Sequence, residues 1–312
     1  MDDSSPVTLA RPEAERYLLL LKLLGPHNLS KGMRDCRTGG SSTPLVMEYV
    51  FTDHLQEDKM LWRTIRSMEV MAHSSNFLLP KLHQPAKAPA NNYTLVVLNQ
   101  QLPRFMPRLW AQEEGTEATQ NIQLNKAETK TKQKLRAKNG KNKEQKNTST
   151  VQSYTRYIPE IIEGDMDSIR PEVKRYYSSQ GSKISDKSHN QETTDLHKCI
   201  SSIRHRTPNH EKPNLCVLVT GALGGRFDHE AANINVLYAF SDMRIVLLSD
   251  DCLIQLLPKT HHHEIYIESS VEGPHCGIFP IGAPSTSTTT TGLKWNLSKH
   301  FFCSFVTSCL AI

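Results

Sequence analysis

The sequence predicts an α/β protein in which a parallel-sheet domain is followed by a β-sandwich domain. Two observations support this prediction. Between residues 215 and 249, an apolar run, a glycine-rich turn, a helical segment and a second apolar run follow one another, which is the order of a βαβ unit in a parallel sheet. After residue 252 the helical periodicity ends, and short β-rich runs alternate with Pro, Gly and Ser.

The composition indicates two domains with a nearly neutral folded part. The chain has 312 residues and a formal net charge of +5. The positive charge is local, because Lys and Arg crowd between Lys126 and Lys146. That run has no aromatic residues among its charges, so we interpret it as a solvated linker and not as a surface for nucleic acid.

The cysteines and the apolar runs indicate a cytosolic protein. The seven cysteines contain no C-x-x-C pair, which fits reduced thiols better than a disulfide framework or a zinc site. The apolar run 17–24 is interrupted by Lys22 and is too short to cross a bilayer. We therefore expect neither a targeting segment nor a contact with a membrane.

Changes in composition divide the chain into three parts. Residues 1–70 have no sustained period, and we predict a weakly structured extension there. Residues 71–250 are predicted to form the α/β domain and residues 251–312 an incomplete, truncated sandwich domain. Residues 111–150 interrupt the first domain; their lysine-rich part cannot bury enough apolar surface to offset its ordering entropy, so we predict disorder.

The elements of both domains follow from local patterns. A buried strand is expected at 93–99, which is rich in Val and Leu. One helix begins at Pro171, which suits a first turn, and ends before Gly181. A second begins after Thr194, where apolar residues recur at helical spacing. Further strands are expected at 215–221, 244–249, 252–258, 264–271 and 275–282, and a further helix at 228–240.

Asp165 and Asp167 lie between a β-branched run and the helix that begins at Pro171. In an extended segment their side chains point to the same side. Like charges held that close require a divalent cation, a shared proton or open solvent. An acidic turn in open solvent is the ordinary alternative to a metal site.

A glycine-rich turn between a strand and a helix is the second candidate site. Gly221, Gly224 and Gly225 precede Arg226 and Asp228. Such glycines let backbone N–H groups approach an anion, and a guanidinium suits phosphate oxygens. The pattern is neither a P-loop nor a dinucleotide fingerprint, and a turn without a ligand is the alternative.

Three further features have both an ordinary and a functional interpretation. Asp195, in the first turn of its helix, is either a partner of the helix dipole or a third Mg²⁺ carboxylate. Three aspartates with Arg226 and a glycine turn supply what phosphoryl transfer requires. Trp295 either fills the core or presents its ring to a ligand. The histidines at 261–263 are interpreted as a polar strand edge and not as a metal site.

Four motifs, in this order, resemble the thiamin pyrophosphokinases: "GDMDSIRPEV", "TTDLHKC", "GALGGRFDHE" and "TTTGLKWNL". The segment 96–110 is similar to the first strand of that family, and 71–80 to its plant members. In total the resemblance covers 71–110 and 155–298. It implies an α/β domain followed by a β-sandwich, and a reaction that moves a pyrophosphoryl group from ATP to the hydroxyethyl oxygen of thiamin, releasing AMP.

The resemblance also implies roles for individual residues. Asp165, Asp167 and Asp195 match the carboxylates that hold Mg²⁺ against the triphosphate. Thiamin is expected against Thr290, Thr291 and Trp295, with the indole stacked on a thiamin ring. The residues expected around the phosphates are Gln191, Thr194, Gly224, Gly225, Arg226 and Asp228. The family's site is shared across a homodimer, so a homodimer is expected here.

Three departures from the family pattern bear on activity. The family's D-G-G-A-N turn, which helps to hold the nucleotide, is missing, and 111–150 stands in its place. The tail after residue 298 does not resemble the family's closing strands, so an unpaired strand edge is expected. Asn190 and Glu192 stand where the family usually has aspartates on each side of Gln191. We therefore expect little turnover from this chain.

Three functions are compatible with these observations. The first is an ATP-dependent thiamin pyrophosphokinase. The second is a non-catalytic relative that keeps the fold, which the missing turn favours. The third is a nucleic-acid-binding protein acting through residues 126–146, which we rank below both; salt-dependent binding to any polyanion without turnover would indicate it.

Overall fold

The computed structural model describes residues 17–24, 45–49, 69–79, 92–113, 121–122, 158–281, 285–298, 300–302 and 308–311. The disorder predicted for the lysine-rich part of 111–150 falls almost entirely outside these residues. In the described part of the chain, no helix is long and apolar enough to cross a membrane.

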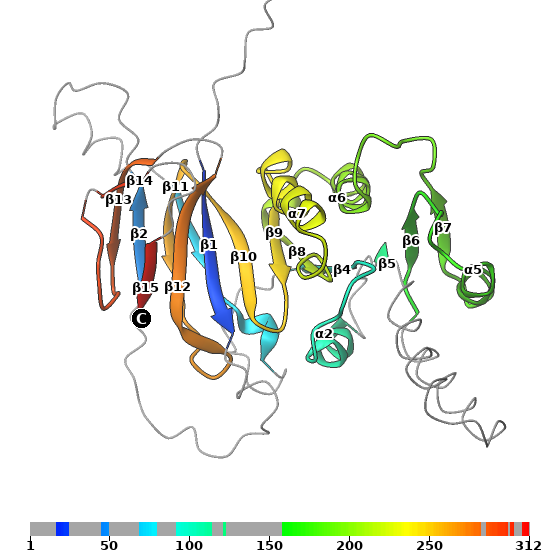
Figure 1. Cartoon of the computed structure of the whole chain (residues 1–312), viewed down its shortest axis with the longest axis horizontal. Coiled ribbons are helices and arrows are strands. Elements are labelled where there is room, and N and C mark those ends of the chain that lie inside the picture. The colour runs from blue at the N-terminus through cyan, green and yellow to red at the C-terminus, as the bar shows by residue number, and fades with distance from the viewer. Residues whose placement is uncertain are drawn as a thin grey trace, which may run out of the picture.

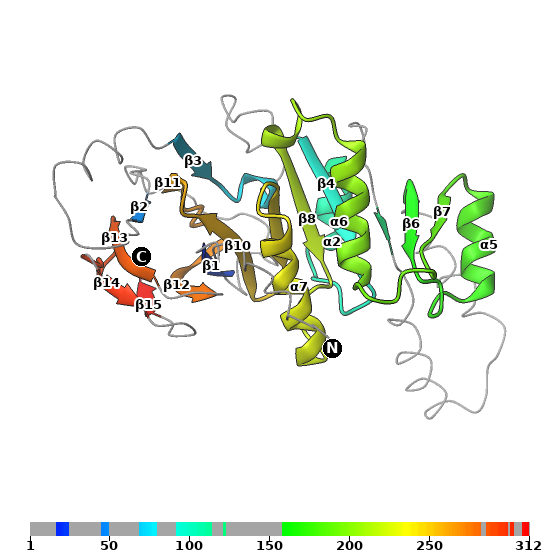
Figure 2. The ribbon, with the colours of Figure 1, turned by 90° about the horizontal axis from the view of Figure 1, so that it is seen from above.

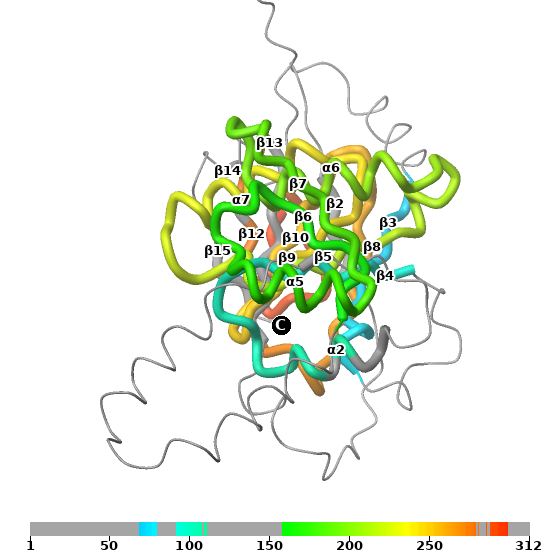
Figure 3. Tube along the Cα trace, turned by 90° about the vertical axis from the view of Figure 1, so that its right-hand side faces the viewer, coloured from blue at the N-terminus to red at the C-terminus, as the bar shows by residue number. Residues whose placement is uncertain are grey.

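A ten-stranded sheet runs through the molecule in the order β15-β12-β1-β10-β9-β8-β4-β5-β6-β7 (Figure 1). Its parallel half ends at β7. Figure 3 shows the molecule from the side on which β7 and α5 lie. The parallel strands are β4 (Asn92–Val97), β5 (Asn121–Ile122), β6 (Ile161–Gly164), β7 (Lys183–Asp186), β8 (Leu215–Thr220) and β9 (Arg244–Leu248). The helices of this half are α2 (Met106–Glu113), α5 (Pro171–Ser179), α6 (Asp195–Arg206) and α7 (Phe227–Ala239), with 3-10 turns η1 (Asn76–Leu78) and η3 (Lys212–Asn214).

The predicted βαβ unit is confirmed, because β8 and β9 are parallel and α7 connects them. Strands β8 and β9 are apolar on both faces, and their alternate residues lie in two separate cores. Val217 and Ile245 pack in the core that contains α6 and α7. Leu218 and Val246 pack in the core that contains α2 and η1. Helices therefore cover both faces of the parallel sheet, as a strand that is apolar on both sides requires.

The other half is a β-sandwich. Strands β1 (Tyr17–Leu24), β10 (Cys252–Pro258), β12 (Glu272–Ile281) and β15 (Ser308–Ala311) continue the large sheet in antiparallel pairs. A second sheet has the order β14-β13-β2-β11-β3. Its strands are β2 (Leu45–Tyr49), β3 (Glu69–His73), β11 (His261–Ile265), β13 (Ser285–Thr291) and β14 (His300–Phe302). Leu257 of β10, Ile265 of β11 and Ile278 of β12 share one apolar core between the sheets.

The structure differs from the sequence prediction within residues 1–70. β1 and β2 lie in the range for which no regular element was expected. β1 pairs with β10 on one side and β12 on the other, and β2 pairs with β11 and β13. Their partners lie more than two hundred residues further along the chain, where a search for local periodicity finds no signal.

Two expectations about the sandwich strands are wrong. The strand expected at 264–271 is β11, which ends at Ile265 and includes the histidine run. His263 is fully buried, so that run is not a polar strand edge. The segment "GLKWNL" lies in a bend after β13, because Gly292, at φ 88°, turns the chain out of the sheet.

The tail after residue 298 adds an outermost strand to each sheet, so an unpaired edge remains among the described strands, now at β14 and β15. β14 pairs with β13, and β15 pairs with β12. The apolar, β-rich tail supplies both strands, although it does not resemble the family's closing segment.

Candidate active site

The predicted site residues of the α/β half follow the ends of parallel strands. Asp165 and Asp167 follow β6, Asp195 opens α6 after β7, and the glycine-rich turn follows β8. Because these strands are parallel, their carboxyl ends lie at one edge of the sheet. Ligands of open α/β sheets bind at that edge.

The segment that carries the first two aspartates is not extended, which corrects the sequence analysis. Met166, between them, has φ of 61°, in the left-handed region that residues with a Cβ seldom adopt. The chain bends over 166–169, so the alternation expected of a strand does not apply. Asp165 is half-buried and Asp167 is exposed.

Lys198 brings two of the three predicted carboxylates together. Its Nζ lies 3.6 Å from Oδ2 of Asp165 and 3.7 Å from Oδ1 of Asp195. The lysine side chain is only 3% exposed, and the carboxylates are 22% and 26% exposed. Lys198 was not among the predicted site residues, although a lysine three positions after Asp195 lies on the same helix face.

The structure does not gather all three aspartates around one point. In the ranges that it describes, no group of three or more His, Cys, Asp or Glu side chains is arranged to hold a metal ion. Asp165 and Asp195 do offer carboxylate oxygens to one cation position, which the ammonium of Lys198 occupies. Carboxylate oxygens are the ligands that Mg²⁺ prefers, so the donor type fits a magnesium ion held beside this lysine.

The start of α6 is fixed by its cap. Thr194 is the N-cap, and its Oγ1 accepts a hydrogen bond from the backbone N–H of His197 at 3.3 Å. The exposed Gln191 donates from Nε2 to the backbone oxygen of Ser188 at 2.8 Å. In this structure both side chains shape the loop before α6, which sets the position of Asp195.

The glycine-rich turn is anchored on both sides. At Gly221, with φ of 74°, an added Cβ would lie 2.7 Å from the carbonyl oxygen of Leu98, so only glycine fits there. At Gly225, with φ of 117°, an added Cβ would lie 3.0 Å from Oε1 of Gln100. From the helix side, Asn233 of α7 donates through Nδ2 to the backbone oxygen of Ala222 at 2.8 Å.

Arg226 and Asp228 form a two-contact ion pair at the start of α7. Nε of Arg226 donates to Oδ1 of Asp228 at 3.0 Å, and Nη2 donates to Oδ2. This hydrogen bonding lowers the pKa of Asp228 and raises the pKa of Arg226. Both side chains are more than half exposed, so an incoming phosphate can compete for the guanidinium at little cost.

The residues predicted to face thiamin lie on and after β13. Thr290 is buried, and its Oγ1 accepts a hydrogen bond from the N–H of Leu297 at 2.8 Å. Its hydroxyl therefore holds the bend that presents Trp295. The Trp295 side chain is 59% exposed, and Nζ of Lys294 lies 4.9 Å from its ring centroid. Thr291 is also exposed.

The two groups of predicted residues lie at opposite ends of the molecule. β13 is at one end and β6 at the other in both Figure 1 and Figure 2. The structure therefore brings Asp165 and Asp195 together, whereas Trp295 of the same chain lies at the opposite end of the molecule.

Comparison with known protein families gives two matches. Residues 127–247 match the thiamin pyrophosphokinase catalytic domain, and residues 262–309 match the thiamin pyrophosphokinase vitamin B1 binding domain. The first match begins inside the lysine-rich insert. The second continues to residue 309, beyond the position near 298 where the sequence analysis placed the end of the resemblance.

Individual relatives agree with these matches. The chain is 71% identical over 247 residues to thiamine pyrophosphokinase 2 of Oryza sativa subsp. japonica, covering 77% of this chain and 86% of the relative. It is 52% identical over 240 residues to thiamine pyrophosphokinase 1 of Arabidopsis thaliana, covering 75% and 82%. Among solved structures, yeast thiamin pyrophosphokinase aligns at 20% identity with a TM-score of 0.49, covering 81% and 83%.

Proposed function

Since this chain belongs to the thiamin pyrophosphokinase family, we propose that it transfers a pyrophosphoryl group from ATP to thiamin and releases AMP. In this reaction the hydroxyl oxygen of thiamin forms a bond to the β-phosphorus of ATP. The bond from that phosphorus to the oxygen bridging it to the α-phosphate breaks, and the hydroxyl proton is released.

The observation that carries the proposal is the convergence of Asp165 and Asp195 on Lys198 at the carboxyl edge of the parallel sheet. The three groups come from two motifs that are separate in the sequence. A buried ammonium holds both carboxylates in place. Preorganised charges of this kind are what phosphoryl transfer requires, because its catalysis is mostly positioning and charge stabilisation.

Each segment at this edge then has a defined task. Asp165, Asp167 and Asp195 are the residues that would hold Mg²⁺, which neutralises triphosphate charge when bound. The guanidinium of Arg226 releases the carboxylate of Asp228 and binds phosphate oxygens in its place. Gly224 and Gly225 leave the backbone N–H groups accessible to the same phosphate. Gln191 and Thr194 keep the loop before α6 in place.

We also propose a homodimer in which each site uses both chains. The aspartates and the exposed Trp295 lie at opposite ends of one chain, and a second copy can supply the missing end (Figure 1). In that arrangement the indole of one protomer stacks on thiamin held against the aspartates of its partner. A cytosolic location is proposed from the free cysteines Cys199, Cys216, Cys252 and Cys276.

Calorimetric titration with Mg·ATP tests the assignment of the aspartates. Asp165→Asn and Asp167→Asn should each abolish Mg²⁺-dependent nucleotide binding while the fold stays intact. Asp242→Asn is the matched control, because Asp242 pairs with Arg204 on the surface at 2.9 Å. Undiminished affinity in both site variants would contradict the proposed role.

Mixing two inactive variants tests the shared site. Asp165→Asn and Trp295→Ala each damage a different half of a site. If sites form between chains, subunit exchange gives heterodimers with one intact site of two. The mixture should then recover about a quarter of the wild-type rate, from random pairing of two-fold dimers. A mixture no more active than its components would exclude a site shared between chains.

A further inference from the structure

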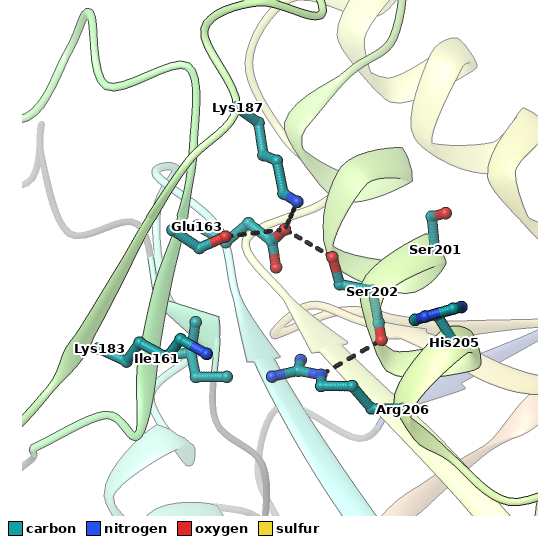
Figure 4. Close-up of a pocket in the computed structure, with 9 residues that line it drawn as sticks. Ile161, Glu163, Lys183, Lys187, Ser201, Ser202, His205 and Arg206 are labelled. Atoms are coloured by element: carbon teal, nitrogen blue, oxygen red, sulfur yellow. Dashed lines mark hydrogen bonds and ion pairs between the residues drawn. The ribbon is translucent and has the colours of Figure 1, made fainter.

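We propose that a pocket between β7 and α6 binds a phosphate dianion at a site separate from the nucleotide site described above. The pocket has a volume of about 330 Å³, near the lower end of the range of about 300–1,000 Å³ for small-ligand sites. Its lining residues come from β6, from β7 and the residue after it, and from the second half of α6 (Figure 4). They are Ile161, Glu163, Lys183, Ser185, Lys187, Ser201, Ser202, His205 and Arg206.

The acidic floor of the pocket is already neutralised. Glu163 is 2% exposed, and its Oε1 accepts hydrogen bonds from Ser202 Oγ at 2.5 Å and from Ser185 Oγ at 3.4 Å. The same oxygen lies 3.6 Å from Nζ of Lys187. A buried carboxylate with these three partners is satisfied, so it leaves the other cations of the pocket uncompensated.

Lys183 and Arg206 are those uncompensated cations. Figure 4 shows their side chains reaching toward one another from β7 and from α6. The guanidinium of Arg206 uses Nε to donate to the backbone oxygen of Ser202 at 3.2 Å. Within the described part of the chain, the Lys183 side chain makes no ion pair. Both residues are exposed, so solvent screens their charges when no ligand is bound, and a phosphate between them would gain contacts with both.

The charge of the lining matches a phosphate. Lys183, Lys187 and Arg206 together contribute +3 and Glu163 contributes −1, so the fixed charge is +2 with His205 neutral. A phosphate group carries between about −1.5 and −2 at neutral pH, and its oxygens accept hydrogen bonds from guanidinium and ammonium groups.

The position of Arg206 at the end of a helix does not by itself explain this arrangement. Basic residues in a last helical turn are ordinary, because they complement the helix dipole. Arg204 in the same turn forms an ion pair with Asp242 at 2.9 Å. Arg206 instead faces a cation on the neighbouring strand, which the dipole does not require.

Phosphate in this pocket would tie β7 to α6. The same helix carries Asp195 and Lys198 in its first turn, so the pocket lies on the element that positions the candidate active site. This inference stands apart from the catalytic proposal, since it uses none of the residues assigned to ATP or thiamin.

The test is calorimetric titration of the full chain with inorganic phosphate, without thiamin, nucleotide or Mg²⁺ and at constant ionic strength. We expect a saturable binding event that persists in Arg226→Met. Lys183→Met and Arg206→Met should each weaken it by about tenfold or more, the loss expected for one charge-assisted hydrogen bond. Unchanged melting temperatures of Lys183→Met and Arg206→Met would show that folding is intact.

Two matched variants separate this pocket from other anion sites. Arg204→Met removes the same charge from the same helical turn and should leave phosphate binding unchanged. Arg226→Met removes the guanidinium of the glycine-rich turn and should also leave it unchanged. Absence of phosphate binding in the wild type, or its loss in Arg226→Met and not in Arg206→Met, would overturn the proposal.

A second titration distinguishes free phosphate from a phosphate ester. AMP is titrated into the Arg226→Met variant, with and without Lys183→Met. AMP binding that depends on Lys183 would assign the pocket to phosphate esters, and phosphate binding without AMP binding would assign it to the free ion. Binding of either ligand that is equal with and without Lys183 would count against the pocket.

Discussion

His73 and His263 form a buried hydrogen bond, with 2.9 Å between Nε2 of His73 and Nδ1 of His263. Nε2 of His263 also lies 2.8 Å from the backbone oxygen of Pro258, which can only accept. His263 therefore donates from Nε2–H to Pro258, and its Nδ1 accepts a hydrogen bond from Nε2–H of His73. The pair joins the neighbouring strands β3 and β11.

We predict that this pair makes stability depend on pH. Burial lowers the pKa of His263 to about 4, against the hydrogen bond with the Pro258 carbonyl, which raises it, and together with the neighbouring His261 and His262, which lower it. Because the folded-state pKa lies below the unfolded value of 6.5, the folded chain binds fewer protons between these values. The free energy of unfolding should be maximal above about pH 6.5. It should fall by on the order of 3 kcal/mol as the pH is lowered toward 4.

Urea unfolding at intervals between pH 7 and pH 4 measures this dependence. His263→Gln should reduce the slope in that range, because glutamine does not titrate. His210→Gln is the control, since His210 is an exposed histidine. Equal slopes in the wild type and His263→Gln would show that the pair does not cause the effect.

Lys198→Met should destabilise the chain by about 2 kcal/mol, below the usual cost of breaking a fully buried ion pair because both aspartates are partly exposed. Without the ammonium, two carboxylates face each other uncompensated. Adding Asp195→Asn to this variant should therefore cost less than Asp195→Asn costs alone. A double-mutant cycle from chemical unfolding measures the coupling, and strict additivity would mean that Lys198 and Asp195 do not interact.

Met166→Gly should be more stable than Met166→Ala by about 1 kcal/mol, because glycine tolerates the left-handed backbone at this position. Both variants lose the Met166 side chain beyond Cβ, so their difference reports mainly the backbone conformation. In a segment with negative φ, the alanine variant is instead the more stable of the two. Thermal unfolding of the two variants decides the sign, and a more stable alanine variant would be evidence against a left-handed Met166.

Gly221→Ala should cost more than about 2 kcal/mol, since the new Cβ combines a strained backbone with a close approach to the carbonyl oxygen of Leu98. Gly224→Ala is the matched control. Its φ is 88°, but an added Cβ there meets nothing within 4 Å. The control should cost about 1 kcal/mol, and equal losses would show that the contact with Leu98 is unimportant.

We also predict that turnover is low and that restoring a D-G-G-A-N turn raises it. The turn is absent from the sequence, and a reacting phosphate displaced by about 1 Å can react about a hundredfold more slowly. AMP release with thiamin and Mg·ATP compares the two chains. Equal rates would show that 111–150 replaces the turn without loss.

The sequence predicted the elements whose signals are local. The helix after Thr194 and the strand before Gly221 appear within a residue or two of their expected ends, because cap, periodicity and glycine act on neighbouring residues. β1 was not found, since its partners β10 and β12 come from the far end of the chain.

The roles of the candidate site residues stay a prediction, and the structure adds the geometry that the sequence could not give. The motifs indicated Asp165 and Asp195 as neighbours in the fold, and the structure brings both to one cation. That this cation is Lys198 depends on how α6 is rotated against β6, which spacing alone does not determine. No sequence pattern predicted the left-handed backbone of Met166, because glycine is the residue that usually indicates such a backbone.

The place of β1 between β10 and β12 also constrains how the chain folds during synthesis. Strands β4 to β9 have all their sheet partners within one continuous stretch, so that half can form as it leaves the ribosome. Tyr17 must wait for Pro258 and Ile281, its partners on either side, until more than two hundred further residues have been made. Such distant pairings form slowly, because a long loop must close, at a cost in entropy, before any stabilising contact forms. During translation this apolar strand therefore stays without its partners longer than any other strand that the structure describes, which leaves its backbone groups open to pairing with other chains in the meantime.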